Sequence, residues 1–321
     1  MRQWISDTVH PDNSLLKLYC TGSSVRRECR SLSDTPFHSP LINIPLAGWL
    51  ALYLSGYMHG NISIGNVFLL SSPITRERFN MDNARIPWEI LKGREFENVP
   101  QAVKDRFRDV PKPSITDVDK TLETIKEIED LACELGISIH CQCKALLSDD
   151  DLSVYLPTYL TQEHSAPSIS GTFEFMSYFA RMGYEEGDIV DRNRLYFQNP
   201  LDDLESFLWV GVWACFFNNQ VDCEKIAGSV RMVRDQLGDS TGREDAWARI
   251  RRRVYVEKSY EGAHVLGEMA RFLIELRPKV DDLFAKFYKI CRAKPTILQF
   301  DQMAFEGVLI FMELYKRHFS S

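Results

Sequence analysis

The sequence predicts an α+β fold that is predominantly helical, and three observations support this prediction. The stretch 200–217, PLDDLESFLWVGVWACFF, begins with acidic residues that suit the electropositive start of a helix and is then apolar on every side. Further helical patterns follow it, at 224–237, 243–256, 262–276, 279–291 and 300–319. Short strand patterns precede Gly171, after which the chain reads as helical throughout. Because a helix without a polar face must be buried all round, 200–217 is expected to be the axis of a helical domain at 45–321.

The length and charge of the chain limit its class. Its 321 residues suffice for one large domain or two small ones, and its net charge is −7 with acidic and basic residues interspersed. This balance gives no electrostatic case for binding nucleic acid or an anionic membrane. The exception is a basic cluster, which indicates a solvated helix face or, alternatively, a site for phosphate or an acidic partner. It consists of Arg249, Arg251, Arg252 and Arg253.

The cysteines and the first residues bear on the compartment. Eight cysteines are scattered along the chain, several of them inside apolar segments, which is typical of a reducing compartment. The opening MRQWISDTVHPDNS has no basic region followed by an apolar run, so no signal peptide is predicted. We therefore expect a cytoplasmic or nuclear protein.

The first part of the chain leads into a polar loop. Residues 1–44 form a lead-in with few periodic segments, in which 15–19 could be a strand. A buried helix is expected at 45–58, PLAGWLALYLSGYM, whose proline can occupy the first turn. The polar stretch 59–66 follows, and then a short apolar strand at 67–70. Polar groups between two buried elements either form a simple turn or are presented by a rigid scaffold as a site.

A long excursion, 71–139, interrupts the domain and is expected to be an insertion. Its first part is polar and broken by prolines, with a possible short helix around 100–107. Its second part, 117–135, has the pattern of an amphipathic helix. Thr116 is a candidate N-cap for this helix, and Gly136 suits its C-terminal stop.

Two patterns after the insertion bear on metal binding. The motif HCQC contains His140, Cys141 and Cys143, but a zinc site needs about four ligands and no second pair lies near. We expect no zinc and attribute the motif to the alternating side chains of a strand at 136–147. Three acids, at 149–151, follow directly. They form either a solvated turn or oxygen ligands for Mg²⁺, which favours carboxylate and phosphate oxygens.

Four motifs occur in the order found in the larger, helical lobe of protein kinases. They are HGNISIGN at 59–66, DDDLS at 149–153, GTFEFMS at 171–177 and DDLESFLWV at 202–210. This combination resembles the fungal-type protein kinase family, whose corresponding segments read roughly HRDIS.GN, an Asp-aromatic-Asp-Leu, GT..FMS and DDLES. The resemblance spans about 46–217, with the insertion inside it. It implies a kinase-like large lobe and a fungal setting.

The resemblance also implies roles for individual residues in a site that, in the family, uses ATP and Mg²⁺. The catalytic loop would open at His59, and the base that accepts the substrate hydroxyl proton would fall at Asn61. Asn66 and Asp149 would be the residues that hold magnesium.

Three further residues would have supporting roles. Asp203 resembles the Asp that opens the buried helix in kinases and holds the backbone of the catalytic loop by hydrogen bonds. Gly171 and Thr172 would form the anchor that follows the metal segment. The resemblance implies that such supporting roles outlast a loss of catalysis.

The sequence departs from the kinase pattern at several positions. Asn61 replaces a carboxylate, and an amide cannot take up a proton near neutral pH, so general-base assistance worth about 10²- to 10⁴-fold would be missing. Gly60 replaces the arginine that usually pairs with activation-loop charge, and Asp150 replaces an aromatic residue. No GxGxxG loop or VAIK-like lysine occurs before His59. The small N-terminal lobe is therefore expected to be missing or vestigial, with 1–44 as a remnant of it or of the hinge.

These departures favour a catalytically impaired pseudokinase that acts by binding a protein partner, with ATP and Mg²⁺ as possible ligands. One alternative is an active Ser/Thr kinase that transfers phosphoryl groups from ATP by positioning alone. Another is a fragment of a longer kinase. An enzyme unrelated to kinases finds no support, because the sequence offers no pairing of a nucleophile with a base.

Overall fold

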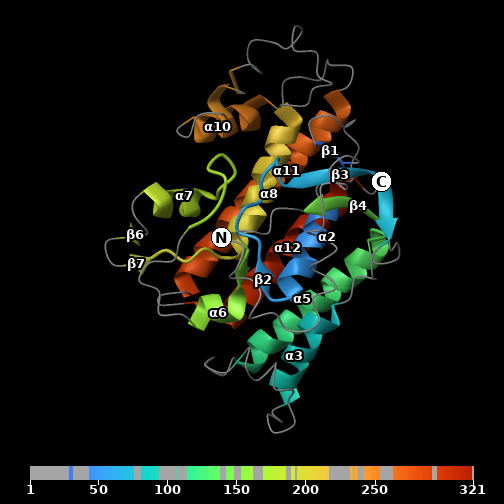
Figure 1. Ribbon diagram of the computed structural model, residues 1–321, viewed down its shortest axis with the longest axis vertical. Coiled ribbons are helices and arrows are strands. Elements are labelled where there is room, and N and C mark those ends of the chain that lie inside the picture. Colours follow the sequence, from blue (N-terminus) through green and yellow to red (C-terminus); the bar gives the residue numbers. More distant parts are fainter. Residues whose placement is uncertain are drawn as a thin grey trace, which may run out of the picture.

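The computed structural model describes residues 29–31, 43–75, 81–93, 107, 114–137, 142–147, 153–161, 169–185, 189–191, 194–216, 232–233, 235–237, 242–253, 263–290 and 295–319. This part of the chain is predominantly helical, as the sequence predicts (Figure 1). Its helices are α2 (Asn43–Leu54), α3 (Asp82–Gly93), α5 (Ile115–Glu134), α6 (Leu156–Thr161), α7 (Tyr178–Glu185), α8 (Pro200–Phe216), α10 (Arg243–Arg253), α11 (Ala263–Ile290) and α12 (Ile297–Phe319). Its strands are β1 (Cys29–Ser31), β2 (Tyr57–Met58), β3 (Val67–Thr75), β4 (Gln142–Leu147), β5 (Val154–Tyr155), β6 (Ile189–Asp191) and β7 (Arg194–Leu195).

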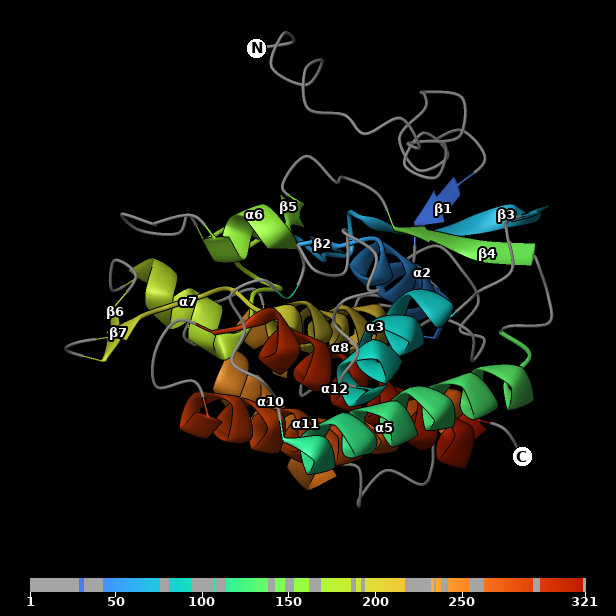
Figure 2. The same ribbon diagram turned by 90° about the horizontal axis from the view of Figure 1, so that it is seen from below.

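Helix α8 is the central element of the core, and α11 and α12 pack against it (Figures 1 and 2). Its side chains Leu201, Leu208, Trp209 and Val212 are fully buried. This confirms the prediction that the stretch without a polar face forms a helix inside the domain.

The start of α8 is fixed by a reciprocal pair of hydrogen bonds. The side chain of Asn199 accepts a hydrogen bond from the Leu201 N–H at 3.0 Å, and Asp202 accepts one from the Asn199 N–H at 2.7 Å. This is the arrangement of a capping box. Pro200 occupies the first helical position, where its missing N–H costs nothing.

The described residues form three small antiparallel sheets. The largest has the order β1-β3-β4, and Cys29 of β1 pairs with Leu70 of β3. Part of the predicted lead-in 1–44 therefore adds a strand to β3, whereas the strand predicted at 15–19 lies outside the described residues. The second sheet pairs β2 with β5, and the third pairs β6 with β7.

The expectation that the chain is purely helical after Gly171 is wrong at β6 and β7. These strands have three and two residues. Segments of this length are too short to show the period-two alternation by which a strand is recognised in a sequence.

The insertion predicted at 71–139 begins later than expected and contains an additional helix. β3 continues to Thr75, past the end predicted at residue 70. Helix α3 was not predicted, and of the stretch 100–107 only Phe107 is described.

The amphipathic helix predicted at 117–135 is α5, whose N-cap is Ser114 and not Thr116. The Ser114 hydroxyl accepts a hydrogen bond from the Asp117 N–H at 3.1 Å, because the helix begins two residues earlier than predicted. Its C-terminal stop is at Gly136, as predicted. There Gly136 has a φ of 72° and the Ile137 N–H binds the Ala132 carbonyl at 2.8 Å.

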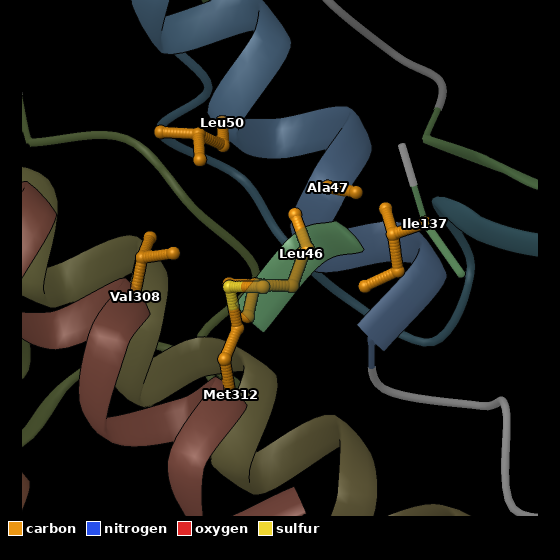
Figure 3. A pocket seen from close by; sticks show the side chains of 7 residues that line it. Leu46, Ala47, Leu50, Ile137, Val308 and Met312 are labelled. Atoms are coloured by element: carbon orange, nitrogen blue, oxygen red, sulfur yellow. The ribbon is translucent and has the colours of Figure 1, made fainter. Parts of the chain in front are cut away.

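The insertion packs into the same hydrophobic core as the rest of the described chain. Ile125 and Ile128 of α5 are fully buried, and α5 lies against both α3 and α12. Side chains of α2, α5, α12 and Ile137 enclose an apolar cavity of about 10 Å³ (Figure 3). These side chains are Leu46, Ala47, Leu50, Ala132, Ile137, Val308 and Met312. A cavity this small leaves the packing between the insertion and the lobe nearly complete.

The two helices predicted at 262–276 and 279–291 are one continuous helix, α11, which passes through Pro278. Proline lacks an N–H and usually ends a helix, because a proline inside a helix costs about 3 kcal/mol of stability. Leu276, Val280 and Phe284 on both sides of Pro278 are buried, and α11 packs on α8 and α12. Burial of apolar side chains on either side of the proline therefore outweighs the lost hydrogen bond.

None of the helices in the described ranges combines the length and the apolarity needed to cross a membrane.

The packing of α5 predicts that Ile128→Ala destabilises the whole domain. Loss of a fully buried isoleucine side chain is expected to lower the free energy of unfolding by about 2–5 kcal/mol, with one cooperative transition in urea. The exposed Lys126 on the same helix provides the control, because Lys126→Ala should change stability by less than about 0.5 kcal/mol. A separate early transition in Ile128→Ala, with the main transition unchanged, would show that the insertion folds on its own.

Candidate functional site

The polar loop 59–66 connects β2 to β3 and is bound to the start of α8 by Asp203. The Asp203 carboxylate accepts the backbone N–H of His59 at 3.0 Å and that of Gly60 at 2.9 Å. It also accepts the indole N–H of Trp49 on α2 at 2.9 Å. One buried carboxylate thus joins α2, α8 and the loop.

The environment of Asp203 is balanced between burial and hydrogen bonding. Burial raises the pKa of Asp203, and the proximity of His59 and the three hydrogen bonds oppose that rise. Gly60 has a φ of 75°, a left-handed conformation that glycine adopts without strain. In this conformation the consecutive N–H groups of His59 and Gly60 both point to one carboxylate.

Asn61 is the residue at which the predicted site residues meet. The Thr172 hydroxyl donates to the Asn61 side-chain oxygen at 2.8 Å, and the Asn66 side-chain N–H donates to the Asn61 carbonyl at 2.8 Å. The Asn61 backbone N–H lies 3.3 Å from Nδ1 of His59. The structure therefore brings together His59, Asn61, Asn66, Thr172 and Asp203.

The segment 169–177 packs closely against the loop at Gly171. A Cβ atom at this position would lie 3.1 Å from Cγ of Met176 and 3.3 Å from the Gly60 carbonyl oxygen. The φ of Gly171 is 145°, which also disfavours other residues. The Thr172 carbonyl accepts the N–H groups of Phe175 and Met176 at 2.8 and 3.0 Å and so closes the turn that follows.

A polar cavity of about 10 Å³ lies between the loop, this segment and the start of α8. Asn61, Thr172, Gln198 and Asp202 are among the residues that line it. A space of this size can hold about one water molecule. The cavity therefore has no room for a larger ligand.

A second buried carboxylate, Asp202, binds the segment to α8. The Ser177 hydroxyl donates to Asp202, and Ser177 in turn accepts the Ala180 N–H at 2.9 Å near the start of α7. Burial raises the pKa of Asp202 to about 7, against the hydrogen bonds from Ser177 and the Asn199 N–H, which lower it. The sequence shows Asp202 only as an acid at a helix start, and nothing in its local pattern indicates Ser177 as its partner.

Arg243 at the start of α10 was not predicted from the sequence to contact the site. Its guanidinium donates to the Met176 carbonyl at 2.8 Å and the Glu174 carbonyl at 3.2 Å, and lies 3.9 Å from the ring centre of Trp209. Burial lowers the pKa of Arg243 to about 9, although Glu205, 3.7 Å away, opposes this change. Glu205 also accepts the Tyr178 N–H at 3.2 Å. Arg243 and Glu205 together thus hold the C-terminal end of the segment, which lies beyond Thr172.

Of the two residues predicted to hold magnesium, Asn66 is described and Asp149 lies outside the described residues. In the HCQC motif, for which no zinc is expected, His140 and Cys141 also lie outside them, whereas Cys143 is part of β4. Within the described ranges, no three or more His, Cys, Asp or Glu side chains are grouped so that they could hold a metal ion.

Comparison of the chain with protein-family models, with curated proteins and with solved structures gives no match.

The contacts of Asp203 predict that Asp203→Asn destabilises the domain by about 2–4 kcal/mol, measured by unfolding in urea. The amide retains one oxygen but turns an NH₂ group toward backbone or indole N–H donors, which then lose their acceptor. Asp130→Asn, at an exposed position of α5, is the control and should change stability by less than about 0.5 kcal/mol. An equal cost for both variants would contradict the role of Asp203 in holding the loop.

The raised pKa of Asp202 predicts that stability decreases as the pH rises from about 4 to about 7. In this interval the folded state retains a proton that the unfolded chain has released, so the stabilisation present at low pH is lost as the folded carboxyl ionises. The slope is up to about 1.4 kcal/mol per pH unit. Two neighbouring titratable side chains also act on the pKa of Asp202: a hydrogen bond with Tyr196 lowers it, and the charge of Glu205 raises it.

Asp202→Asn should flatten this dependence in urea unfolding at a series of pH values, since the amide does not titrate. Asp130→Asn, at an exposed position of α5, should leave it as in the natural chain. An unchanged slope in Asp202→Asn would show that the Asp202 carboxyl does not carry the effect.

Proposed function

We propose that the chain is a kinase-like lobe of the fungal-type protein kinase family that is catalytically impaired and acts by binding a protein partner. The observation that carries this proposal is the position of Asn61. An amide stands in a loop that Asp203 and Thr172 bind through hydrogen bonds, at the place where the resemblance implies a catalytic carboxylate.

The contacts of the loop support the kinase-like part of the proposal. Asp203 binds two consecutive backbone N–H groups of the loop, which is the function that the resemblance implies for it. Asn66 binds the Asn61 carbonyl, and Thr172 binds the Asn61 side chain. Residues of three of the four motifs, at 59–66, 171–177 and 202–210, thus lie in contact, which supports the proposal.

The chemistry of Asn61 supports the impaired activity. A carboxylate at this position would accept the proton of a substrate hydroxyl, whereas an amide has no basic lone pair at neutral pH. Its Oδ1 already accepts the Thr172 hydroxyl. The loop therefore retains the contacts that position it and lacks the group that would remove a proton.

Asn66 is the described residue that fits a magnesium ion. Its Nδ2 donates to the Asn61 carbonyl, so Oδ1 is the atom of this amide that can face a cation, and Mg²⁺ favours such oxygen ligands. Asp149 would supply a second ligand. When bound together with ATP, the ion would neutralise charge on the phosphate oxygens.

An active Ser/Thr kinase is the second candidate, and the intact positioning of the loop favours it. Alignment of substrate and nucleotide alone can contribute to phosphoryl transfer. In this case Asn66 would hold Mg²⁺, and Asn61 would orient the substrate hydroxyl by hydrogen bonding without accepting its proton.

Thermal unfolding with and without millimolar Mg-ATP distinguishes the two candidates, because a ligand that binds only the folded state raises its stability by mass action. The impaired binding lobe is expected to show no magnesium-dependent rise in Tm and no transfer of phosphate to itself or to peptides. A rise that Asp149→Ala abolishes and the exposed control Asp130→Ala retains, together with phosphate transfer, would overturn the proposal in favour of the active kinase.

A further inference from the structure

The side chain of Gln198 lies between the loop and the segment 169–172. It precedes α8 by two residues and is 6% exposed. Its Nε2 donates to the Gly60 carbonyl at 3.1 Å and to the Ser170 carbonyl at 3.0 Å. Its Oε1 accepts the Ser170 N–H at 3.2 Å. It also lies 3.3 Å from the Ser170 hydroxyl, whose single proton can go to this oxygen or to the Gly60 carbonyl. The amide thus uses both of its N–H groups and its oxygen.

The contacts of Gln198 converge with others on the Gly60 carbonyl. The Ser170 hydroxyl lies 3.3 Å from this oxygen, within hydrogen-bond distance, and the Gly171 backbone approaches it so closely that an added Cβ would lie 3.3 Å away. The Gly60 N–H, on the other side of the same residue, is bound to Asp203. Gly60 is therefore held by α8 through its N–H and by the segment 169–172 through its carbonyl.

We propose that Gln198 is the positioning residue that docks the segment 169–172 onto the loop, and thereby places the Thr172 hydroxyl on Asn61, through protein contacts alone. The inference rests on the proposed function in that it assigns this docking to a kinase-like site. Gly60 stands where the resemblance implies an arginine that pairs with charge on the activation loop. Glycine has no side chain that could form such a pair. The fixed amide of Gln198 joins the same two parts of the chain without any covalent modification.

The chemistry of the side-chain amide explains why position 198 requires glutamine. Ser170 presents a donor and an acceptor of its backbone side by side, and a side-chain amide has one of each at matching spacing. A carboxylate lacks the donors, and a thioether of similar length lacks both. Either replacement leaves the Gly60 and Ser170 carbonyls without this donor in a buried place.

The test compares Gln198→Glu and Gln198→Met with the natural chain at full length, produced without modifying enzymes and confirmed by mass to be unmodified. Hydrogen exchange of individual backbone amides, followed by NMR, is the measurement. We expect the Ser170 N–H to be protected in the natural chain and to exchange at least about tenfold faster in both variants. The His59 and Gly60 N–H groups, which bind Asp203, should keep their rates. Gln302→Glu, at a half-buried position of α12, is the matched control and should change none of these rates.

Three results would overturn the inference. The first is an unprotected Ser170 N–H in the unmodified natural chain, which needs no variant and stands even if the variants fail to fold. The second is an unchanged Ser170 rate in both variants. The third is an equal acceleration of Ser170, His59 and Gly60, which would indicate general destabilisation. Because the exchange measurement uses no nucleotide, it can succeed where the Mg-ATP test of the proposed function fails, and the two failures are distinguishable.

Discussion

The arrangement of the site depends on the hydrogen bonds between the Asp203 carboxylate and two consecutive backbone N–H groups, across 144 positions of sequence at His59. The loop that donates them is short and polar and lies between β2 and β3. The helix that provides the carboxylate is buried on all sides and packed by α11 and α12. A buried helix of the core thus determines where the loop lies.

This arrangement requires charged and polar groups in the interior. Asp202, Asp203 and Glu205 are each 2% exposed or less, and each has a different set of donors. Burial of such groups costs several kcal/mol unless hydrogen bonds replace the lost water. Here the donors come from the loop, from Ser177 and Tyr178, from α2 and from α8 itself. Arg243 of α10 adds an ion pair with Glu205 at 3.7 Å. The acids at the start of α8 thus connect elements that would otherwise meet mainly through apolar contacts. The interior polar layer specifies one arrangement of these elements, which apolar packing alone would leave less defined.

The sequence predicts the parts of the structure that depend on local pattern. Helix α8 follows from a run without a polar face, α5 from its apolar stripe, and the end of α5 from Gly136. The four motifs, through the resemblance, also single out the residues that meet at Asn61. What the sequence does not show depends on distant contacts. Gln198 has no motif around it, and the helical pattern at 243–256 does not indicate that Arg243 contacts the carbonyls of Glu174 and Met176. The continuity of α11 through Pro278 depends on the helices packed beside it, and strand β1 is recognisable only by its partner β3.

The most direct test of this account is the exchange rate of the His59 and Gly60 N–H groups in the unmodified natural chain, without any ligand. If Asp203 ties the loop to the core, both groups should exchange only through large-scale unfolding, at free energies close to those of the amides in the middle of α8. Exchange of either group at the rate of an exposed loop would contradict the account. It would mean that the loop moves independently of α8, although Asp203 on α8 should fix its position.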